Sequence, residues 1–338
     1  MVNIASRATQ FLAFLYVLAC GSAWAATDKG PVERLLPASL SALACERPLQ
    51  AVDLAKNGLF DAQVDMIRLT PKSTSSKVTI VAARERAISL AKANQQLGYA
   101  YGVCEDGSAW VAAFPAPSPL KLDGAIVSLD DSAGRVCMPK TLRVLFAPEN
   151  RGRSFLVPLQ TGFSARLPDA RGYASVSCTP RQFESSGQRE WALIALGGAK
   201  VNAIDVLPPL GLRDKEAFLN WINQKRRAEN LPDFNLNEEL NSAAVALMQS
   251  KVIHHNLEAL NRARAQLQKK GIELTGENRV QGKSLAEAAG LLWISPSHRD
   301  LLLSPTSDMI GMSVFSDSDH AFVAMLAGRK TQSPVAKK

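Results

Sequence analysis

Two stretches near the C-terminus decide the fold: Gly276-Glu277-Asn278 and Trp293-Ile294-Ser295-Pro296-Ser297-His298-Arg299. A helix-like run from Ser284 to Leu292 separates them, so a carboxylate and an imidazole from different elements can meet at one place. A histidine pair, His254-His255, ends the apolar run that precedes both stretches. The sequence therefore directs the search for function to the last third of the chain.

The residues around these stretches predict a helical domain that ends in a hairpin. Four helices are expected: one from about Asp214, and three whose capping patterns place their starts near Asn235, Asn256 and Ser284. Ser295-Pro296 opens a further short turn, with serine as N-cap and proline at the first helical position. Two apolar runs, Ile310–Phe315 and Ala321–Leu326, are expected to be strands that close the domain.

Residues 215 to 328 resemble the CAP superfamily, which includes the cysteine-rich secretory proteins, the antigen-5 proteins, the plant pathogenesis-related proteins and bacterial SCP domains. The resemblance covers about one third of the chain. It is carried by Leu219-Asn-Trp-Ile-Asn223-Gln-Lys-Arg226, Leu231-Pro232, Leu240 with Ala243-Ala244, Gly276-Glu277-Asn278, Ser295-Pro-Ser-His298-Arg299, Leu302 and Ile310-Gly311. It implies an α-β-α sandwich, so the expected fold class is α+β.

The resemblance also implies a cleft in which glutamate and histidine side chains gather, in some members around a divalent metal. On this sequence the cleft residues are His255, Glu277, Asn278, Ser295 and His298. His255 is preferred over His254 because it directly precedes the expected N-cap Asn256. One departure matters, since many members carry a glutamate three residues after the helical tryptophan and this chain has none there. The predicted metal set is therefore His255, Glu277 and His298.

Two functions follow from this cleft. The favoured one is binding of an apolar ligand, a cell-envelope component or a protein partner, with no agreed catalytic residue. The alternative is a zinc-dependent hydrolase in which His255 and His298 hold Zn²⁺ and Glu277 ligates it or activates its water. If Ser295 is the N-cap, His298 lies in the first helical turn, where the helix dipole favours the neutral, metal-binding imidazole.

The N-terminus predicts export. Arg7 precedes an uncharged apolar stretch, Phe11–Ala19, and Ala23-Trp24-Ala25 fits a signal-peptide cleavage site, so residues 1–25 are expected to be removed. Lipidation at Cys20 is the minor alternative. The apolar stretch is too short for a permanent span, so we expect no transmembrane segment in the mature chain. The sequence leaves periplasm and full secretion open.

Four cysteines remain after the predicted cleavage, and an even count in an exported chain indicates two disulfides. Three pairings are open; we expect Cys45–Cys104 and Cys137–Cys178 because each stays within one segment. The net charge of +8 favours anionic partners, but the basic residues are dispersed, so no specific nucleic-acid binding is expected.

The first two thirds of the chain carry no motif with recognisable chemistry. We expect an α+β region at 26–120, with helices at Leu35–Ala55 and Ala82–Gln96 and a hairpin around Asp106-Gly107. Short alternating runs predict a β-rich domain at 121–205. A Pro/Gly-rich linker at 206–213 leads into the domain at 214–328, and a disordered tail is expected at 329–338.

Overall fold

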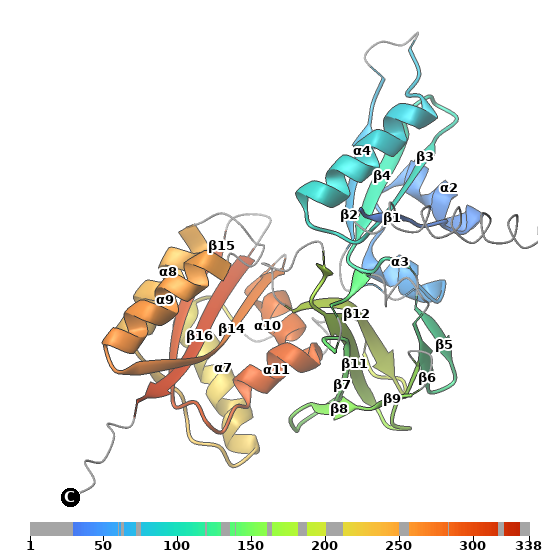
Figure 1. Ribbon diagram of the computed structural model, residues 1–338. Helices are drawn as coiled ribbons and strands as arrows, with labels where there is room; N and C mark the ends of the chain where they lie inside the picture. The colour runs from blue at the N-terminus through green and yellow to red at the C-terminus, as the bar shows by residue number, and fades with distance from the viewer. Residues whose placement is uncertain are drawn as a thin grey trace, which may run out of the picture.

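The computed structural model describes residues 30–59, 61, 64–71, 76–118, 120–129, 136–138, 140–160, 164–181, 188–200, 212–249, 257–282, 284–316 and 321–331. They form an N-terminal unit (30–118), a β-rich domain (120–200) and a C-terminal unit (212–331), as Figure 1 shows. The expected mixture of helices and strands is confirmed. Residues 1–25, most of the predicted linker and the pair His254-His255 lie outside the described residues.

The N-terminal unit is a four-stranded sheet, order β1-β3-β4-β2, with helices on both faces. Leu40 of α2 packs with Trp110 on one face, and Ala87 of α4 packs with Val111 on the other. Its elements are β1 (Val32–Glu33), α2 (Ala38–Glu46), α3 (Ala51–Lys56), β2 (Asp65–Leu69), α4 (Ile80–Ala93), β3 (Gly98–Val103) and β4 (Ala109–Phe114). The predicted hairpin is β3–β4, and Gly107 takes the positive φ of its turn.

The expected single helix from Leu35 to Ala55 is wrong. The structure forms two helices, α2 and α3, and the chain between them is extended at Arg47. Pro48 accounts for the break, because a proline disfavours helical conformation in the residue before it.

The β-rich domain contains two four-stranded sheets that enclose one apolar core. The strand orders are β5-β6-β10-β9 and β12-β11-β7-β8, and Val127, Ala165, Phe146 and Trp191 are among the buried residues between them. The strands are β5 (Lys121–Asp123), β6 (Ile126–Ser128), β7 (Arg143–Pro148), β8 (Phe155–Val157), β9 (Leu159–Gln160), β10 (Ser164–Arg166), β11 (Gly172–Cys178) and β12 (Arg189–Leu196).

Both predicted disulfides are confirmed. Cys45 at the end of α2 bonds Cys104 after β3, and Cys137 bonds Cys178 at the end of β11. Each bond lies within one part of the chain, so the C-terminal unit contains no disulfide among its described residues and relies on packing and hydrogen bonds.

The C-terminal unit is a four-stranded sheet, order β13-β15-β16-β14, with helices on both faces. Leu240 of α8 and Leu267 of α9 pack on one face; Phe218 of α7 and Leu292 of α10 pack on the other. The elements are α7 (Lys215–Ala228), β13 (Asn235–Leu236), α8 (Glu238–Gln249), α9 (Leu257–Lys269), β14 (Ile272–Gly282), α10 (Leu285–Ile294), α11 (Pro296–Leu302), β15 (Met309–Ser316) and β16 (Ala321–Lys330).

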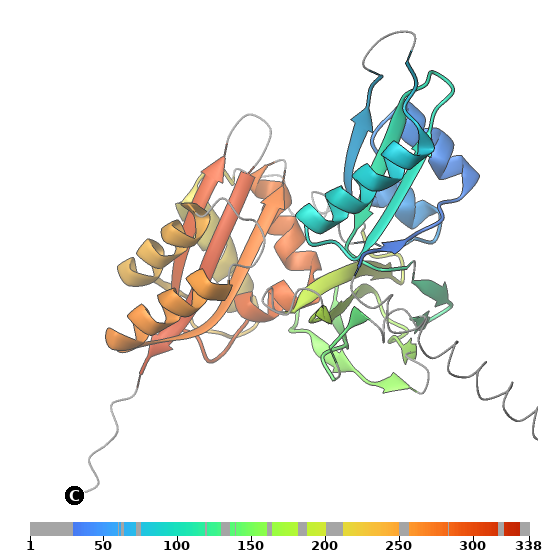
Figure 2. The same ribbon diagram turned by 45° about the horizontal axis from the view of Figure 1, so that its top comes forward.

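The N-terminal and C-terminal units share one topology. In each unit, a short edge strand (β1 or β13) pairs parallel with its neighbour in the sheet (β3 or β15). That neighbour pairs antiparallel with the strand that follows it in the chain (β4 or β16). The fourth strand (β2 or β14) pairs antiparallel with this strand and forms the other edge. Two helices follow the short strand and cover one face, while helices after the fourth strand cover the opposite face. Two like-built units therefore flank the β-rich domain, which Figure 2 shows from a second direction.

Three local expectations in the C-terminal unit need correction. Asn235 does not cap a helix; it lies in β13, and the side chain of Asn237 accepts from Glu239 N and Leu240 N instead. The Gly276-Glu277-Asn278 stretch belongs to a strand, β14, which the sequence did not predict. The predicted tail, 329–338, starts two residues too early, because β16 continues through Lys330 and Arg329 is ion-paired with Glu273.

Ser284 is the expected N-cap of α10, and its hydroxyl accepts a hydrogen bond from Glu287 N at 3.2 Å. Ser284→Ala should therefore lower the free energy of unfolding by about 1 kcal/mol, measured by urea denaturation. Ser89→Ala, at an exposed position inside α4, is the matched control. The control should be neutral or slightly stabilising because alanine has the higher helix propensity. Equal losses in both variants would contradict the capping role.

Within the described residues, no helix has the length and apolar character needed to cross a membrane.

Candidate functional site at the domain interface

A β-bulge decides which way Glu277 points. The register between β14 and β16 shifts between Leu274 and Gly276, so one extra residue interrupts the alternation of faces. Leu274, before the bulge, packs with the residues of α8 and α9. Glu277, after it, is paired with Leu326, which belongs to that same cluster. Glu277 therefore faces the α8–α9 layer.

Asn278 takes the opposite face, toward α11. Its side-chain Nδ2 donates to the carbonyl oxygen of His298 at 2.8 Å. Gly276 shares that face, and a Cβ atom there would lie 2.4 Å from the Leu301 side chain. The glycine thus lets α11 approach the strand, and the asparagine fastens the helix to it.

Glu277 is buried, with a side chain 6% exposed, and it forms an ion pair with Arg279 on the same strand face. Burial raises the pKa of its carboxyl, and the positive charges of Arg279 and then Arg264 of α9 partly offset that rise. The carboxylate is therefore already matched by guanidinium groups.

His298 lies in the first turn of α11, as the sequence predicted. Burial lowers the pKa of its imidazole from 6.5 to about 4. The imidazole is therefore neutral at pH 7. The cause of its lowered pKa is desolvation, whereas the sequence analysis attributed the neutral form to the helix dipole.

Ser295 starts α11, but its side chain makes no capping hydrogen bond. Its hydroxyl instead donates to Glu190 Oε2 of β12 at 2.9 Å, and the Ser297 hydroxyl lies 3.5 Å from the same oxygen. Burial raises the pKa of Glu190 to about 7, although the hydroxyls of Ser295, Ser175 and Ser297 act to lower it. Ser295 therefore occupies the predicted N-cap position, but the capping role predicted for its side chain is wrong, because its hydroxyl donates a hydrogen bond to Glu190.

Arg299 joins the two domains through its guanidinium group, which is fully buried. Nε donates to the carbonyl of Trp293 at 2.6 Å, Nη1 donates to Pro148 O, and Nη2 donates to Glu149 O at 3.4 Å. The guanidinium also stacks 4.3 Å from the Trp293 ring centroid. This one side chain thus satisfies a carbonyl near the C-terminus of α10 and a carbonyl at the end of β7.

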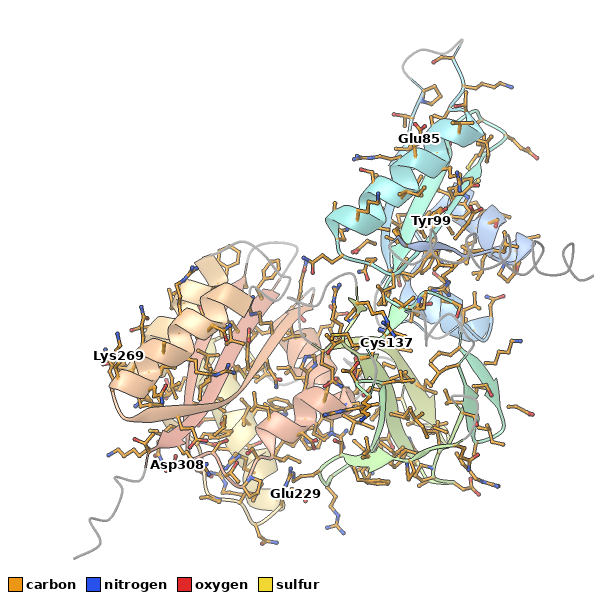
Figure 3. The ribbon with its side chains drawn as sticks, in the orientation of Figure 1. Glu85, Tyr99, Cys137, Glu229, Lys269 and Asp308 are labelled. Atoms are coloured by element: carbon orange, nitrogen blue, oxygen red, sulfur yellow. A yellow bond between two sulfur atoms is a disulfide. The ribbon has the colours of Figure 1, made fainter. Side chains whose placement is uncertain are left out.

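Backbone groups of the loop after β7 extend this contact. Trp293 Nε1 donates to Glu149 O at 3.1 Å, and Ser154 N donates to Asp300 Oδ1 at 2.9 Å. Gly152 N donates to Glu229 Oε1 at 2.7 Å; Figure 3 labels Glu229 where the C-terminal unit meets the β-rich domain. The stretch Trp293–Arg299 is therefore the centre of an interface between two domains.

The predicted cleft is only partly assembled among the described residues. Asn278 and His298 are joined by a hydrogen bond, and Ser295 neighbours them through α11. Glu277 occupies the other sheet face, and its charged partners are arginines. His255 lies outside the described residues, so the three-ligand metal set stays a prediction. Across the described positions, no three His, Cys, Asp or Glu residues gather in a metal-binding group.

Sequence reasoning gave no interface role to Arg299 or Glu190. Arg299 stood inside the quoted stretch but had no role assigned to it. Glu190 had no local signal, because its partner Ser295 lies 105 residues away in the sequence. The only local feature that distinguishes Glu190 is that it is a charged residue near the start of β12, a strand that is otherwise mostly apolar.

No protein-family model matches this chain, and no curated protein matches it either. Among solved structures, an outer surface protein from Borrelia burgdorferi aligns over 36% of this chain and 95% of its own, with 21% identity and a TM-score of 0.32. A cysteine-rich secretory protein from Staphylococcus aureus aligns over 62% and 82%, with 13% identity and a TM-score of 0.28. An extracellular SCP-domain protein from Bacillus anthracis aligns over 62% and 66%, with 14% identity and a TM-score of 0.26. All three TM-scores are below 0.5, so these likenesses do not decide the fold or the function of this chain.

Proposed function

We propose that this chain is an exported protein of the CAP superfamily that acts by binding an anionic component of the cell envelope. The motif residues of the C-terminal unit and its sheet with helices on both faces support the family. Two disulfides support export, since such bonds persist in oxidising compartments. The net charge of +8 supports an anionic partner.

The observation that carries the binding role is the use of the Trp293–Arg299 stretch. Ser295, Trp293 and Arg299 all donate hydrogen bonds to residues of the β-rich domain. A segment whose polar groups fasten one domain to another supplies structure, and its side chains are not free to act on a substrate. Binding by the assembled chain is therefore favoured over catalysis at this segment.

The charges around Glu277 weigh against the zinc-hydrolase alternative. A zinc ion needs ligands whose charge is not already matched, and Glu277 is ion-paired with Arg279 while Arg264 lies near enough to lower its pKa. A zinc ion there would be repelled by both guanidinium groups. His298 lies on the other side of the sheet, where its backbone carbonyl accepts a hydrogen bond from Asn278 of β14.

Zinc content separates the two functions. Protein expressed in zinc-replete medium should hold well under one equivalent of zinc, because the described residues offer no uncompensated ligand set. His298→Ala should leave that content and any envelope binding unchanged, with His320→Ala as the matched histidine control. Sedimentation with isolated cell envelopes should show saturable binding that persists in EDTA. One equivalent of zinc that His298→Ala removes and His320→Ala keeps would establish the hydrolase alternative instead.

A further inference from the structure

Exposed apolar side chains gather at one corner of the β-rich domain. Phe155, Leu156 and Leu159 are 48%, 60% and 36% exposed. They lie within five consecutive positions, at the place where β8 ends and β9 begins. We call residues 155–160 the β8–β9 corner. Scattered apolar residues on a surface are ordinary, but a contiguous group marks a surface used for interaction.

The corner lies on the edges of both sheets. β8 is the last strand of one sheet and β9 is the last strand of the other, with Pro158 between them. An edge strand has one side without a neighbouring strand, so its side chains lack cross-strand neighbours in that direction. In Figures 1 and 2 the corner lies at the end of the β-rich domain opposite the N-terminal unit.

Exposed arginines lie on the strands and the turn next to the apolar residues. Val144 pairs with Val157 and Ala165 pairs with Leu159, so Arg143 of β7 and Arg166 of β10 both lie across from Pro158. Arg151 and Arg153 precede β8 in the turn after β7, and all four arginines are exposed. Residues 121–200 hold eleven Lys and Arg against seven Asp and Glu, which is half of the net charge of the chain.

We propose that the β8–β9 corner docks this protein on an anionic phospholipid bilayer. A bilayer surface presents phosphates above acyl chains, and the corner presents guanidinium groups around leucine and phenylalanine. Arginine binds phosphate oxygens through two parallel hydrogen bonds, and apolar side chains enter the boundary below the headgroups. The proposal rests on the proposed binding to the envelope and names its surface and its lipid partner.

Charge complementarity favours a lipid surface over a protein as the occupant. The four arginines lie on two different sheets and on a turn, so they do not belong to one row matched to a strand or helix. Anionic headgroups are mobile within the bilayer and can reach each guanidinium separately. Each arginine near such a surface contributes about a fivefold gain in partitioning.

Vesicle sedimentation tests the proposal. The chain is used without residues 1–25, because their apolar stretch would bind lipid by itself. It should sediment with phosphatidylglycerol-containing vesicles and much less with pure phosphatidylcholine vesicles. Arg143→Gln with Arg166→Gln should weaken binding about 25-fold. Leu156→Ser with Leu159→Ser should weaken it at least about tenfold, through loss of apolar insertion. Circular dichroism checks that each variant is folded, and Leu156→Ser alone serves if the pair is not.

Two controls distinguish the corner from general basicity. Lys92→Gln with Lys269→Gln removes two exposed cations from the other units, and Val245→Ser removes an exposed apolar side chain from α8; Figure 3 labels Lys269. Both controls should bind nearly as well as the wild type. Absent vesicle binding, or equal loss in control and corner variants, would overturn the proposal. So would corner-dependent binding to envelopes stripped of lipid, which would indicate a protein or polymer; the envelope-binding function itself would then still stand.

Discussion

Arg299→Ala should lower the free energy of unfolding by about 3 kcal/mol and separate the unfolding of the β-rich domain from that of the C-terminal unit. The guanidinium holds carbonyls of Trp293, Pro148 and Glu149, and hydrogen bonds from a charged donor contribute roughly 1.5–3 kcal/mol each. Part of that gain offsets the cost of burying a charge, which also lowers the pKa of Arg299 to about 10. Glu149 O keeps Trp293 Nε1 as a donor. The net loss is therefore smaller than three hydrogen bonds would suggest.

Urea denaturation followed by tryptophan fluorescence and circular dichroism measures this effect. Fluorescence should show one transition for the β-rich domain and the C-terminal unit in the wild type and two in Arg299→Ala, since Trp191 lies in the β-rich domain and Trp221 in the C-terminal unit. Coinciding transitions with an unchanged midpoint would contradict the role of Arg299.

Arg226→Ala is the matched control. Arg226 is equally buried, but its hydrogen bonds go to carbonyls of Pro232, Leu302, Ser304 and Ser307, all within the C-terminal unit. Its loss should destabilise that unit without first releasing the β-rich domain. Comparison of the two variants distinguishes a loss of stability inside the C-terminal unit from a loss of the contact between that unit and the β-rich domain.

Local chemistry explains which parts of the fold could be predicted. Ser284 was found as an N-cap because a capping box depends on residues three positions apart. The disulfides were found because each pair stays within one segment. β14 was missed because the bulge after Leu274 breaks the apolar alternation that marks a strand. Asn235 was chosen over Asn237 because Glu238 follows it by three residues, as in a capping box, whereas Leu240 stands three residues after Asn237.

The site was predicted less well than the fold, and the reason is distance along the chain. Asn278 and His298 fall on neighbouring elements, so their proximity could be expected. The bulge turns Glu277 to the other face, and nothing in Gly276-Glu277-Asn278 marks that turn. Glu190 belongs to a different domain, and its contact with Ser295 exists only after both domains have folded and docked. Contacts between domains leave no periodic pattern in either segment.

Glu190→Gln should stabilise the protein above about pH 7 and change little below about pH 4.5. The pKa of Glu190 is about 7 in the folded chain against an ordinary 4.5, so the folded state binds this proton more tightly. Its contribution to stability is therefore complete below pH 4.5 and lost as the pH rises through 7. The full difference is at most about 3 kcal/mol, since one pKa unit is worth about 1.4 kcal/mol and the side chain keeps some exposure.

His298 gives the opposite pH dependence at the same interface. Its pKa is lowered from 6.5 to about 4, so its contribution is lost as the pH falls below 6.5. Between about pH 4.5 and 6.5 the two residues therefore act against each other, each by about 1.4 kcal/mol per pH unit. Stability of the wild type should vary little over this range from these two groups. Glu190→Gln should expose the loss on acidification, and His298→Gln should expose the loss on raising the pH.

Urea midpoints measured across this pH range provide the test, and the quantity compared is each variant minus the wild type at the same pH. Glu273→Gln is the control, because Glu273 is an exposed carboxylate whose pKa is lowered by Arg329 away from the interface. Its difference from the wild type should be small and of opposite sign. A difference for Glu190→Gln that stays constant from pH 4.5 to 7 would show that Glu190 does not titrate at the interface. If instead the difference follows pH and disappears in the Arg299→Ala background, the proton is bound where the two domains meet, because releasing the β-rich domain returns Glu190 to water.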